Sequence, residues 1–303
     1  MTAATFVLSA GRCGTQWLAK HLGETYADRA AVVHEPLFIH YLPRQLLGVG
    51  DPSKSDNAKL ILDHVARIER QLAGGDYIEC GWQCYAAIPY FAERFAGRIR
   101  VLHLTRDPVL SASSLVTHRC YGSPPRPDGL TEKAQLTPFD AGTSLGEYRE
   151  RWGELDPFDK CLYFWAEIHA LALRLERDLG VPWLRLKFED LFGGDGLDRL
   201  LDFLGLPRRP AIYEARGRRF DRFRFKTDLT WRAEAVRRHP RIVSIARDLG
   251  YAAPSEDTEA IRERYSLPSA QQSGEAGPRS PSRNARCPCG SGRRFKHCHG
   301  RAR

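Results

Sequence analysis

The chain has 303 residues, 42% of them hydrophobic, which is enough to bury one large core and to carry a small additional module. It shows neither a secretory leader nor a run of about eighteen apolar residues, so we expect a soluble, cytoplasmic protein without a membrane span. The net charge is +9, but eight basic and no acidic residues lie between Gly277 and Arg303, which leaves the first 276 residues at only +1 (9 − 8). Binding of polyanions through bulk charge is therefore expected only of the tail.

The eight cysteines fall into two groups. Five are scattered through the first 161 residues, and three crowd into the last seventeen. Scattered thiols with one tight cluster indicate a reduced compartment and a metal site, and they speak against a secreted disulfide scaffold.

The first predicted elements are a short strand and a helix joined by a turn of small residues. An apolar run over 6–8 ends in a turn at 9–14, and apolar residues from Trp17 onward recur at helical spacing. Such a turn brings backbone N–H groups and the positive end of a helix dipole toward an anion. We therefore predict a phosphate-binding loop here, and the alternative is an ordinary turn between a strand and a helix.

This loop differs from that of the nucleotide triphosphatases. Only two residues separate Gly11 from Gly14, where the triphosphatase loop has four residues between its glycines, and the Lys that follows there is missing. The cation of this loop is Arg12, inside the turn. The difference predicts a nucleotide whose 5′ end is not a magnesium triphosphate.

Four more strands are predicted along the chain, at 31–35, 77–81, 99–105 and 183–188. Helices are predicted at 60–72, at 88–95, from 108 onward, in a long helix that is interrupted at 156–157 and ends at 180, at 197–204 and at 233–249. Strands that alternate with helices predict an α/β fold with three α/β/α layers and a mainly parallel central sheet.

The composition divides the chain into three parts. We predict a main domain over 1–253, a flexible linker over 254–283 and a small C-terminal module over 284–303. The stretch 266–283 is rich in Ser, Pro, Gly and Gln and has little apolar content, which is typical of a linker. Within the main domain, the proline-rich stretch 122–142 is expected to be a long loop or lid.

Polar residues follow two of the predicted strands. His34 and Glu35 come at the end of the second strand, and Arg106 follows the fourth, with Ser114 eight residues later on a predicted helix. The carboxyl ends of the strands are where open α/β sheets bind ligands. Together with Arg12, these residues predict an anion site with two ends, as required by an adenosine that carries phosphates at both its 5′ and 3′ positions.

These stretches resemble the motifs of the sulfotransferase family, whose donor is 3′-phosphoadenosine 5′-phosphosulfate (PAPS). In that family a P-K-S-G-T-T-W or G-R-S-G-T loop binds the 5′-phosphosulfate, and R-D/N-P with a Ser eight positions after the Arg binds the 3′-phosphate. The corresponding stretches here are Gly11-Arg12-Cys13-Gly14-Thr15-Gln16-Trp17 and Arg106-Asp107-Pro108 with Ser114. Lys187-Phe188-Glu189-Asp190-Leu191 is similar to the R-Y-E-D-L stretch of the family.

The resemblance covers about 6–253 and implies the P-loop-like fold of the sulfotransferases. It also implies a set of donor-binding residues, which are Gly11, Arg12, Cys13, Gly14, Thr15, Gln16, Arg106 and Ser114. Cys13 and Gln16 stand where the family usually has Ser and Thr or Ser. The contacts to the 5′-phosphate are therefore expected to depend more on Thr15 and on backbone N–H groups.

The implied reaction is the in-line transfer of a sulfuryl group from PAPS to a hydroxyl or amine of an unidentified acceptor, with a carbohydrate among the candidates. Arg12 and the helix N-terminus are expected to stabilise the charge that develops on the leaving phosphate. The acceptor needs a general base, and relatives that use a Glu at this point favour Glu35, with His34 as the alternative. Neighbours on a strand point to opposite faces, so only one of the two is expected to serve.

Two further features of the main domain allow a functional and a structural interpretation. Trp82 and Tyr85, with the stretch from Gly122, are candidates for an acceptor pocket or for the core. The basic stretch from Arg216 to Arg219, with Lys226 and Thr227, is a candidate clamp on the 3′-phosphate or a solvated basic turn.

The C-terminal module contains Cys287, Cys289, Cys298 and His299 around a Gly-Ser-Gly turn. Three thiolates and an imidazole suit a closed tetrahedral zinc site, and the alternative is a redox-active or incidental cysteine cluster. The stretch resembles the SEC-C motif, C-x-C-x-S-G-x-x-x-K-x-C-[CH], a small zinc module of bacterial secretion ATPases and assorted enzymes. A module of about twenty residues cannot build a sufficient core, so zinc is expected to supply its folding free energy. Its basic residues suggest an acidic protein or ribosomal RNA as a partner.

Two other functions are compatible with parts of the sequence. The main domain could hold adenosine 3′,5′-bisphosphate without turnover, as a sensor or a protein associated with nucleic acid. A P-loop phosphotransferase is disfavoured, because the loop lacks its Lys-Ser/Thr pair and no clear magnesium partner is found. A plausible base after the second strand favours an enzyme.

Overall fold

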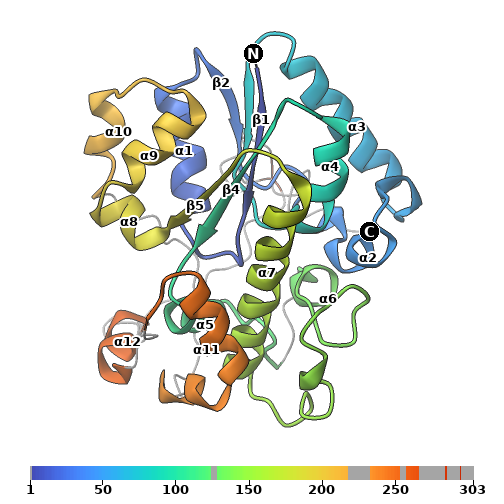
Figure 1. Cartoon of the computed structure of the whole chain (residues 1–303), viewed down its shortest axis with the longest axis vertical. Helices are drawn as coiled ribbons and strands as arrows, with labels where there is room; N and C mark the ends of the chain where they lie inside the picture. The colour runs from blue at the N-terminus through green and yellow to red at the C-terminus, as the bar shows by residue number, and fades with distance from the viewer. Residues whose placement is uncertain are drawn as a thin grey trace.

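A parallel five-stranded sheet lies at the centre of the protein (Figure 1). The computed structural model describes residues 2–123, 128–217, 233–252 and 257–265, together with Asn284 and Arg294. The strand order is β2-β3-β1-β4-β5, so β1 lies in the middle, beside β3 and β4. The strands are β1 (Ala4–Leu8), β2 (Ala30–Val33), β3 (Asp76–Glu79), β4 (Ile99–Thr105) and β5 (Trp183–Lys187).

Helices connect the strands and cover both faces of the sheet. The α-helices are α1 (Thr15–Thr25), α2 (Pro43–Val49), α3 (Ala58–Gln71), α4 (Ile88–Arg94), α5 (Pro108–Thr117), α6 (Leu130–Ala134), α7 (Pro157–Leu179), α8 (Phe188–Gly193), α9 (Gly196–Leu204), α10 (Pro210–Glu214), α11 (Pro240–Asp248) and α12 (Thr258–Tyr265). The 3-10 helices are η1 (Phe38–Tyr41), η2 (Pro52–Lys54), η3 (Tyr85–Ala87), η4 (Gly146–Tyr148) and η5 (Ala233–Arg238).

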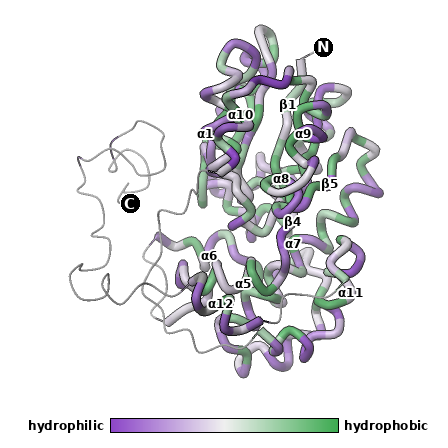
Figure 2. Tube along the Cα trace, turned by 90° about the vertical axis from the view of Figure 1, so that its left-hand side faces the viewer, coloured by the Kyte–Doolittle hydropathy of each residue, from purple (hydrophilic) through white to green (hydrophobic). Residues whose placement is uncertain are grey.

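The alternation of side chains along the strands separates the core into two halves. On β1, Phe6 and Leu8 belong to the half that α3, α4 and α7 cover, and Val7 belongs to the half that α1 and α9 cover (Figure 1). The outer helices are hydrophobic on one side only, and in Figure 2 hydrophobic and hydrophilic residues alternate along α9 and α11. The predicted three-layer α/β/α fold with a mainly parallel sheet is confirmed.

All five predicted strands are present, and two of the predicted helices have other bounds than expected. The long helix α7 is not interrupted at 156–157 but begins there, because Asp156 caps its N-terminus by accepting a hydrogen bond from the Asp159 N–H group. The helix predicted over 233–249 is divided into η5 and α11. The division falls at Pro240, which has no N–H group to continue a helix.

Two segments that were predicted as a loop and as a linker contain helices instead. The stretch 122–142, expected to be a loop or lid, includes α6, and Arg44 of α2 forms an ion pair with Asp140 at 2.7 Å. The segment predicted as a linker from 254 contains α12, whose Ile261 and Tyr265 are buried against the rest of the fold. The folded unit therefore extends beyond 253, at least to Tyr265.

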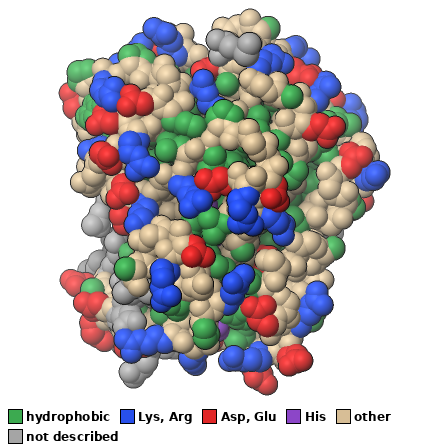
Figure 3. All heavy atoms as spheres, in the orientation of Figure 1, with side chains coloured by type: hydrophobic (Ala, Val, Ile, Leu, Met, Phe, Trp, Pro, Cys, Tyr) green, Lys and Arg blue, Asp and Glu red, His purple; other side chains and the backbone are tan. Residues whose placement is uncertain are grey.

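The surface of the main domain carries charges of both signs. In Figure 3, basic and acidic side chains are interspersed over the face that is shown. This agrees with the near-neutral charge of the first 276 residues. Among the described residues, no helix is both long enough and apolar enough to cross a membrane.

Candidate active site

The predicted phosphate loop connects β1 to α1 at the carboxyl edge of the sheet. Gly11, Arg12 and Gly14 all have left-handed backbone angles, with φ of 78°, 58° and 86°. A Cβ atom at Gly11 would lie 3.3 Å from the indole of Trp82, and one at Gly14 would lie 3.2 Å from the ring of Phe192. Glycine is thus required at both positions, because the backbone is left-handed and because a side chain there would come too close to a neighbouring ring.

The structure brings Arg12, Arg106 and Ser114 together in one cluster. Arg12 Nε donates a hydrogen bond to Ser114 Oγ at 3.1 Å, and Arg106 Nη1 donates to the Arg12 carbonyl oxygen at 2.9 Å. This contact is possible because β1 and β4 are neighbours, so the turns that follow them lie side by side. The two predicted ends of the anion site, Arg12 in the loop and Arg106 with Ser114 after β4, are therefore linked by hydrogen bonds.

Arg106 itself is almost completely enclosed, with 5% of its surface exposed. Its guanidinium carbon lies 4.8 Å from the centre of the Phe188 ring, and Nη2 donates to the hydroxyl of Tyr265 at 2.9 Å. Arg106 Nε is buried and has no hydrogen-bond partner among the described residues. A buried cationic donor without a partner is costly, and an anionic ligand is one group that would satisfy it.

The stretch Phe188-Glu189-Asp190-Leu191 contacts both phosphate motifs. Glu189 Oε1 accepts a hydrogen bond from the backbone N–H of Asp107 at 3.3 Å, and Oε2 accepts one from the Tyr251 hydroxyl at 3.0 Å. Phe188 lies under Arg106 and against Gly14. Three sequence motifs that are far apart along the chain thus meet at one place.

His34 and Glu35 lie beside this loop. His34 Nε2 is 3.4 Å from the hydroxyl oxygen of Thr15, the first residue of α1, and 3.8 Å from Glu35 Oε1. Both side chains are mostly buried, with 9% and 14% exposed, and His34 Nδ1 has no partner among the described residues. The two side chains were expected to point to opposite faces, and this is wrong. The strand ends at Val33 and Glu35 has a left-handed φ of 43°, which breaks the alternation.

The two residues that depart from the family pattern have different surroundings. Cys13 is fully buried, and its thiol donates to the Gly11 carbonyl at 3.0 Å. Burial raises the pKa of this thiol to about 12, against the opposing effect of Arg106, so it is neutral at pH 7. Gln16 is partly exposed on the first turn of α1. The Cys13 side chain therefore lies in the core and contacts the loop backbone at Gly11, and the Gln16 side chain remains accessible to solvent.

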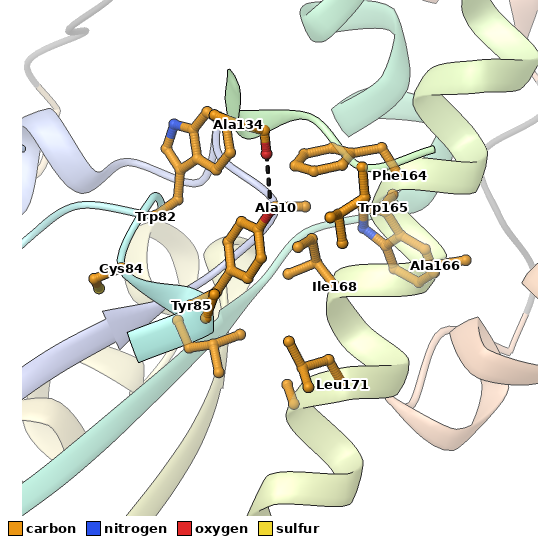
Figure 4. Packing of buried hydrophobic residues seen from close by; sticks show 14 of the residues in the cluster. Ala10, Trp82, Cys84, Tyr85, Ala134, Phe164, Trp165, Ala166, Ile168 and Leu171 are labelled. Carbon is orange, nitrogen blue, oxygen red and sulfur yellow. Dashed lines mark hydrogen bonds between the residues drawn. The ribbon is translucent and has the colours of Figure 1, made fainter. Parts of the chain in front are cut away.

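Trp82 and Tyr85, the candidates for an acceptor pocket, belong to the hydrophobic core. Figure 4 shows both rings among buried side chains, with Phe164 edge-on to Trp82, and the Tyr85 hydroxyl donates to the Ala134 carbonyl at 2.8 Å. Trp82 supports the loop by its contact with Gly11. Of the basic residues in the stretch 216–219, only Arg216 is described, and its Nη2 donates to the Gly194 carbonyl at 3.0 Å. Lys226 and Thr227 lie outside the described residues.

The sequence did not point to Tyr265 as a neighbour of Arg106. The two residues are 159 positions apart, and the segment around Tyr265 was expected to be a linker. Only the amphipathic spacing of Ile261 and Tyr265 could have indicated a packed helix.

No metal site is found within the described part of the chain, where no three His, Cys, Asp or Glu residues are arranged to hold an ion. The predicted zinc ligands Cys287, Cys289, Cys298 and His299 lie outside the described residues. Their donor set of three thiolates and one imidazole fits zinc by its chemistry.

The comparison with protein families confirms the C-terminal motif. Residues 283–301 match the family model described as the SEC-C motif. A segment of 53 residues is 49% identical to the protein translocase subunit SecA of Nocardioides sp., which amounts to 18% of this chain and 5% of SecA. The chain therefore spans only a small fraction of the length of that relative.

Three solved sulfotransferase structures are similar to this chain. The sulfotransferase domain from the curacin biosynthetic pathway is 16% identical with a TM-score of 0.43, and the similarity covers 88% of this chain and 99% of that domain. The sulfotransferase from Alicyclobacillus acidocaldarius is 15% identical with a TM-score of 0.44, over 86% of this chain and 99% of that one. The sulfotransferase domain of the Synechococcus PCC 7002 olefin synthase is 17% identical with a TM-score of 0.38, over 88% and 96%.

Proposed function

We propose that this protein is a PAPS-dependent sulfotransferase. The observation that carries the proposal is the meeting of three motifs at the carboxyl edge of the sheet. The Arg12 side chain donates a hydrogen bond to Ser114, and the Arg106 side chain donates one to the Arg12 carbonyl. The Glu189 carboxylate accepts a hydrogen bond from the backbone N–H of Asp107. A cluster of two guanidinium groups beside the N-terminus of a helix suits a ligand with more than one phosphate group.

In the proposed reaction an acceptor oxygen or nitrogen attacks the sulfur atom of PAPS in line. The bond between sulfur and the 5′-phosphate oxygen breaks, and the acceptor proton moves to a general base. The products are the sulfated acceptor and adenosine 3′,5′-bisphosphate. Arg12 and the first N–H groups of α1 stabilise the negative charge that grows on the leaving phosphate. Arg106 and Ser114 hold the 3′-phosphate, with Ser114 also fixing the direction of the Arg12 side chain.

Glu35 is the proposed base, and His34 is the second candidate. His34 Nε2 lies 3.4 Å from Thr15 Oγ1, at the loop where the donor is proposed to bind, and 3.8 Å from Glu35 Oε1. We propose that the acceptor hydroxyl binds beside Thr15, close to this pair of side chains. In this arrangement His34 orients the carboxylate, and Glu35 takes the proton.

The test of this proposal is the transfer of labelled sulfate from PAPS to pooled metabolites, glycans and proteins. We expect label in at least one pool. A protein that binds adenosine 3′,5′-bisphosphate tightly but labels nothing in any pool would instead support a sensor. Binding of ATP with magnesium and transfer of phosphate would support a phosphotransferase and contradict the proposal.

We also propose that Cys287, Cys289, Cys298 and His299 bind one zinc ion, which stabilises the C-terminal module and leaves no position open for catalysis. Its partner is proposed to be an acidic protein or ribosomal RNA, because basic residues adjoin the ligands in the sequence. The match to the SEC-C motif over 283–301 includes all four ligands and supports this proposal.

Elemental analysis of protein purified without chelator should give about one zinc per chain. Substitution Cys298→Ser should reduce the zinc content several-fold, since a closed site needs all four ligands. Cys161→Ala removes a buried thiol of α7 and is the matched control, which should keep the metal. A zinc content near zero in the wild-type protein would contradict the zinc assignment.

A further inference from the structure

The hydroxyl of Tyr265 lies between the Arg106 side chain and the first turn of α5. It donates a hydrogen bond to the Leu110 carbonyl at 3.0 Å and accepts one from Arg106 Nη2 at 2.9 Å. Because the single hydroxyl proton is directed to Leu110, an oxygen lone pair is left facing the guanidinium. The direction of both bonds is therefore fixed by the chemistry of the phenol.

This contact comes from an element outside the sheet. Tyr265 is the last residue of α12, and it is 4% exposed, as Ile261 one turn earlier is 3% exposed. The start of the helix is also held, since Thr258 Oγ1 accepts a hydrogen bond from the Ala233 N–H and donates one to Glu234 Oε2, both at 3.1 Å. The helix is thus anchored at both ends, and its C-terminal residue is directed at Arg106.

Tyr265 restricts a side chain that would otherwise have more freedom. The Arg106 guanidinium is fixed at three points, by the Arg12 carbonyl at Nη1, by Tyr265 at Nη2 and by the Phe188 ring below. Its Nε stays without a partner among the described residues. A guanidinium that is already fixed in the unliganded protein loses less conformational entropy when a ligand binds.

We infer that Tyr265 is a positioning residue of the nucleotide site, which orients Arg106 toward the 3′-phosphate of the donor and makes α12 part of that site. This inference rests on the proposed function. It places a residue from the segment that leads to the SEC-C module in contact with a donor-binding arginine. The donor site is then formed by two distant parts of the chain, the sheet and a helix that follows it.

The test compares two nucleotides that differ in one phosphate, using full-length protein and calorimetric titration. Tyr265→Phe keeps the ring and removes both hydroxyl bonds. We expect it to weaken the binding of adenosine 3′,5′-bisphosphate about tenfold, the size of one lost hydrogen bond to a charged group. Binding of adenosine 5′-phosphate, which lacks the 3′-phosphate, should change less than about twofold, since Arg106 Nη1 still holds the Arg12 carbonyl.

Two further variants separate positioning from general stability. Tyr26→Phe removes another hydroxyl, which donates to the Pro207 carbonyl at 2.7 Å at the far end of α1, and should leave both affinities unchanged. Arg106→Lys cannot make both of the side-chain bonds of Arg106. We expect that adding Tyr265→Phe to Arg106→Lys causes no further loss of bisphosphate affinity, because the two residues act together.

The possible outcomes are distinct. If Tyr265→Phe weakens the binding of both nucleotides by the same factor, Tyr265 has a general structural role and the inference is overturned. An unchanged bisphosphate affinity, or additive losses in the double variant, would overturn it as well. A wild-type protein that binds neither nucleotide would contradict the proposed function, and that result is separate from a failure of Tyr265 alone.

Discussion

Arg12→Ala is expected to lower the rate of sulfuryl transfer about 100- to 1000-fold, the usual effect of removing one donor that stabilises transition-state charge. Affinity for adenosine 3′,5′-bisphosphate should fall less, since Arg106 and the N–H groups of α1 remain. Arg12 has a left-handed φ of 58°, and Ala meets the same backbone strain there. The fall in rate therefore measures the loss of the guanidinium group and not a change in backbone strain. Single-turnover rates with labelled PAPS measure it directly.

Two comparisons make the result for Arg12 specific. Ser114→Ala removes the acceptor of the Arg12 Nε bond and should reduce the rate by a smaller factor, about tenfold. Arg208→Ala is the matched control, because Arg208 is an exposed arginine of the surface that pairs with Asp198 and Asp202. If Arg12→Ala and Arg208→Ala have equal rates, Arg12 does not contribute to the transfer step.

Glu35→Gln is expected to abolish at least 99% of transfer, a loss of about 100-fold or more, while leaving the affinity for adenosine 3′,5′-bisphosphate within about twofold. Gln has the shape of Glu but cannot take the acceptor proton. The measurement is the rate at saturating donor, with binding determined by calorimetry on the same preparation. Full activity of this variant would remove Glu35 from the mechanism.

His34→Asn decides between the two candidate bases. If His34 only orients the Glu35 carboxylate, its loss should reduce the rate by about tenfold, less than the loss caused by Glu35→Gln. The reverse order of effects would assign the base to His34. Glu24→Gln, on an exposed part of α1, should have no effect and controls for the loss of one negative charge.

The sheet was predictable because each of its strands is marked by a pattern of neighbouring residues in the sequence. Each strand is a short apolar run between polar turns, and the order of strands and helices along the chain requires parallel pairing. The sites of Arg12 and Arg106 followed from their places after β1 and β4. Their direct contact was not predictable, since it depends on β1 and β4 being neighbours in the sheet.

Other features depend on contacts that no local pattern encodes. The left-handed backbone of Glu35 turns its side chain toward His34, and no Gly or Asn indicated it. Trp82 and Tyr85 are core residues because Phe164 of α7 packs edge-on against Trp82, and the Trp82 ring stacks on Tyr85. Tyr265 reaches Arg106 through the packing of α12 on α5, although the composition of the stretch 266–283 that follows α12 suggested a linker.

The measurement that tests the central claim most directly is a thermal-shift titration of the wild-type protein without magnesium. Adenosine 3′,5′-bisphosphate at 100 times its Kd should stabilise the fold by about 2.7 kcal/mol and raise the Tm by roughly 5 to 10 °C. ATP with magnesium should give no comparable shift, because the loop has no Lys for a triphosphate. A shift with ATP and magnesium, and none with the bisphosphate, would contradict the proposed donor site.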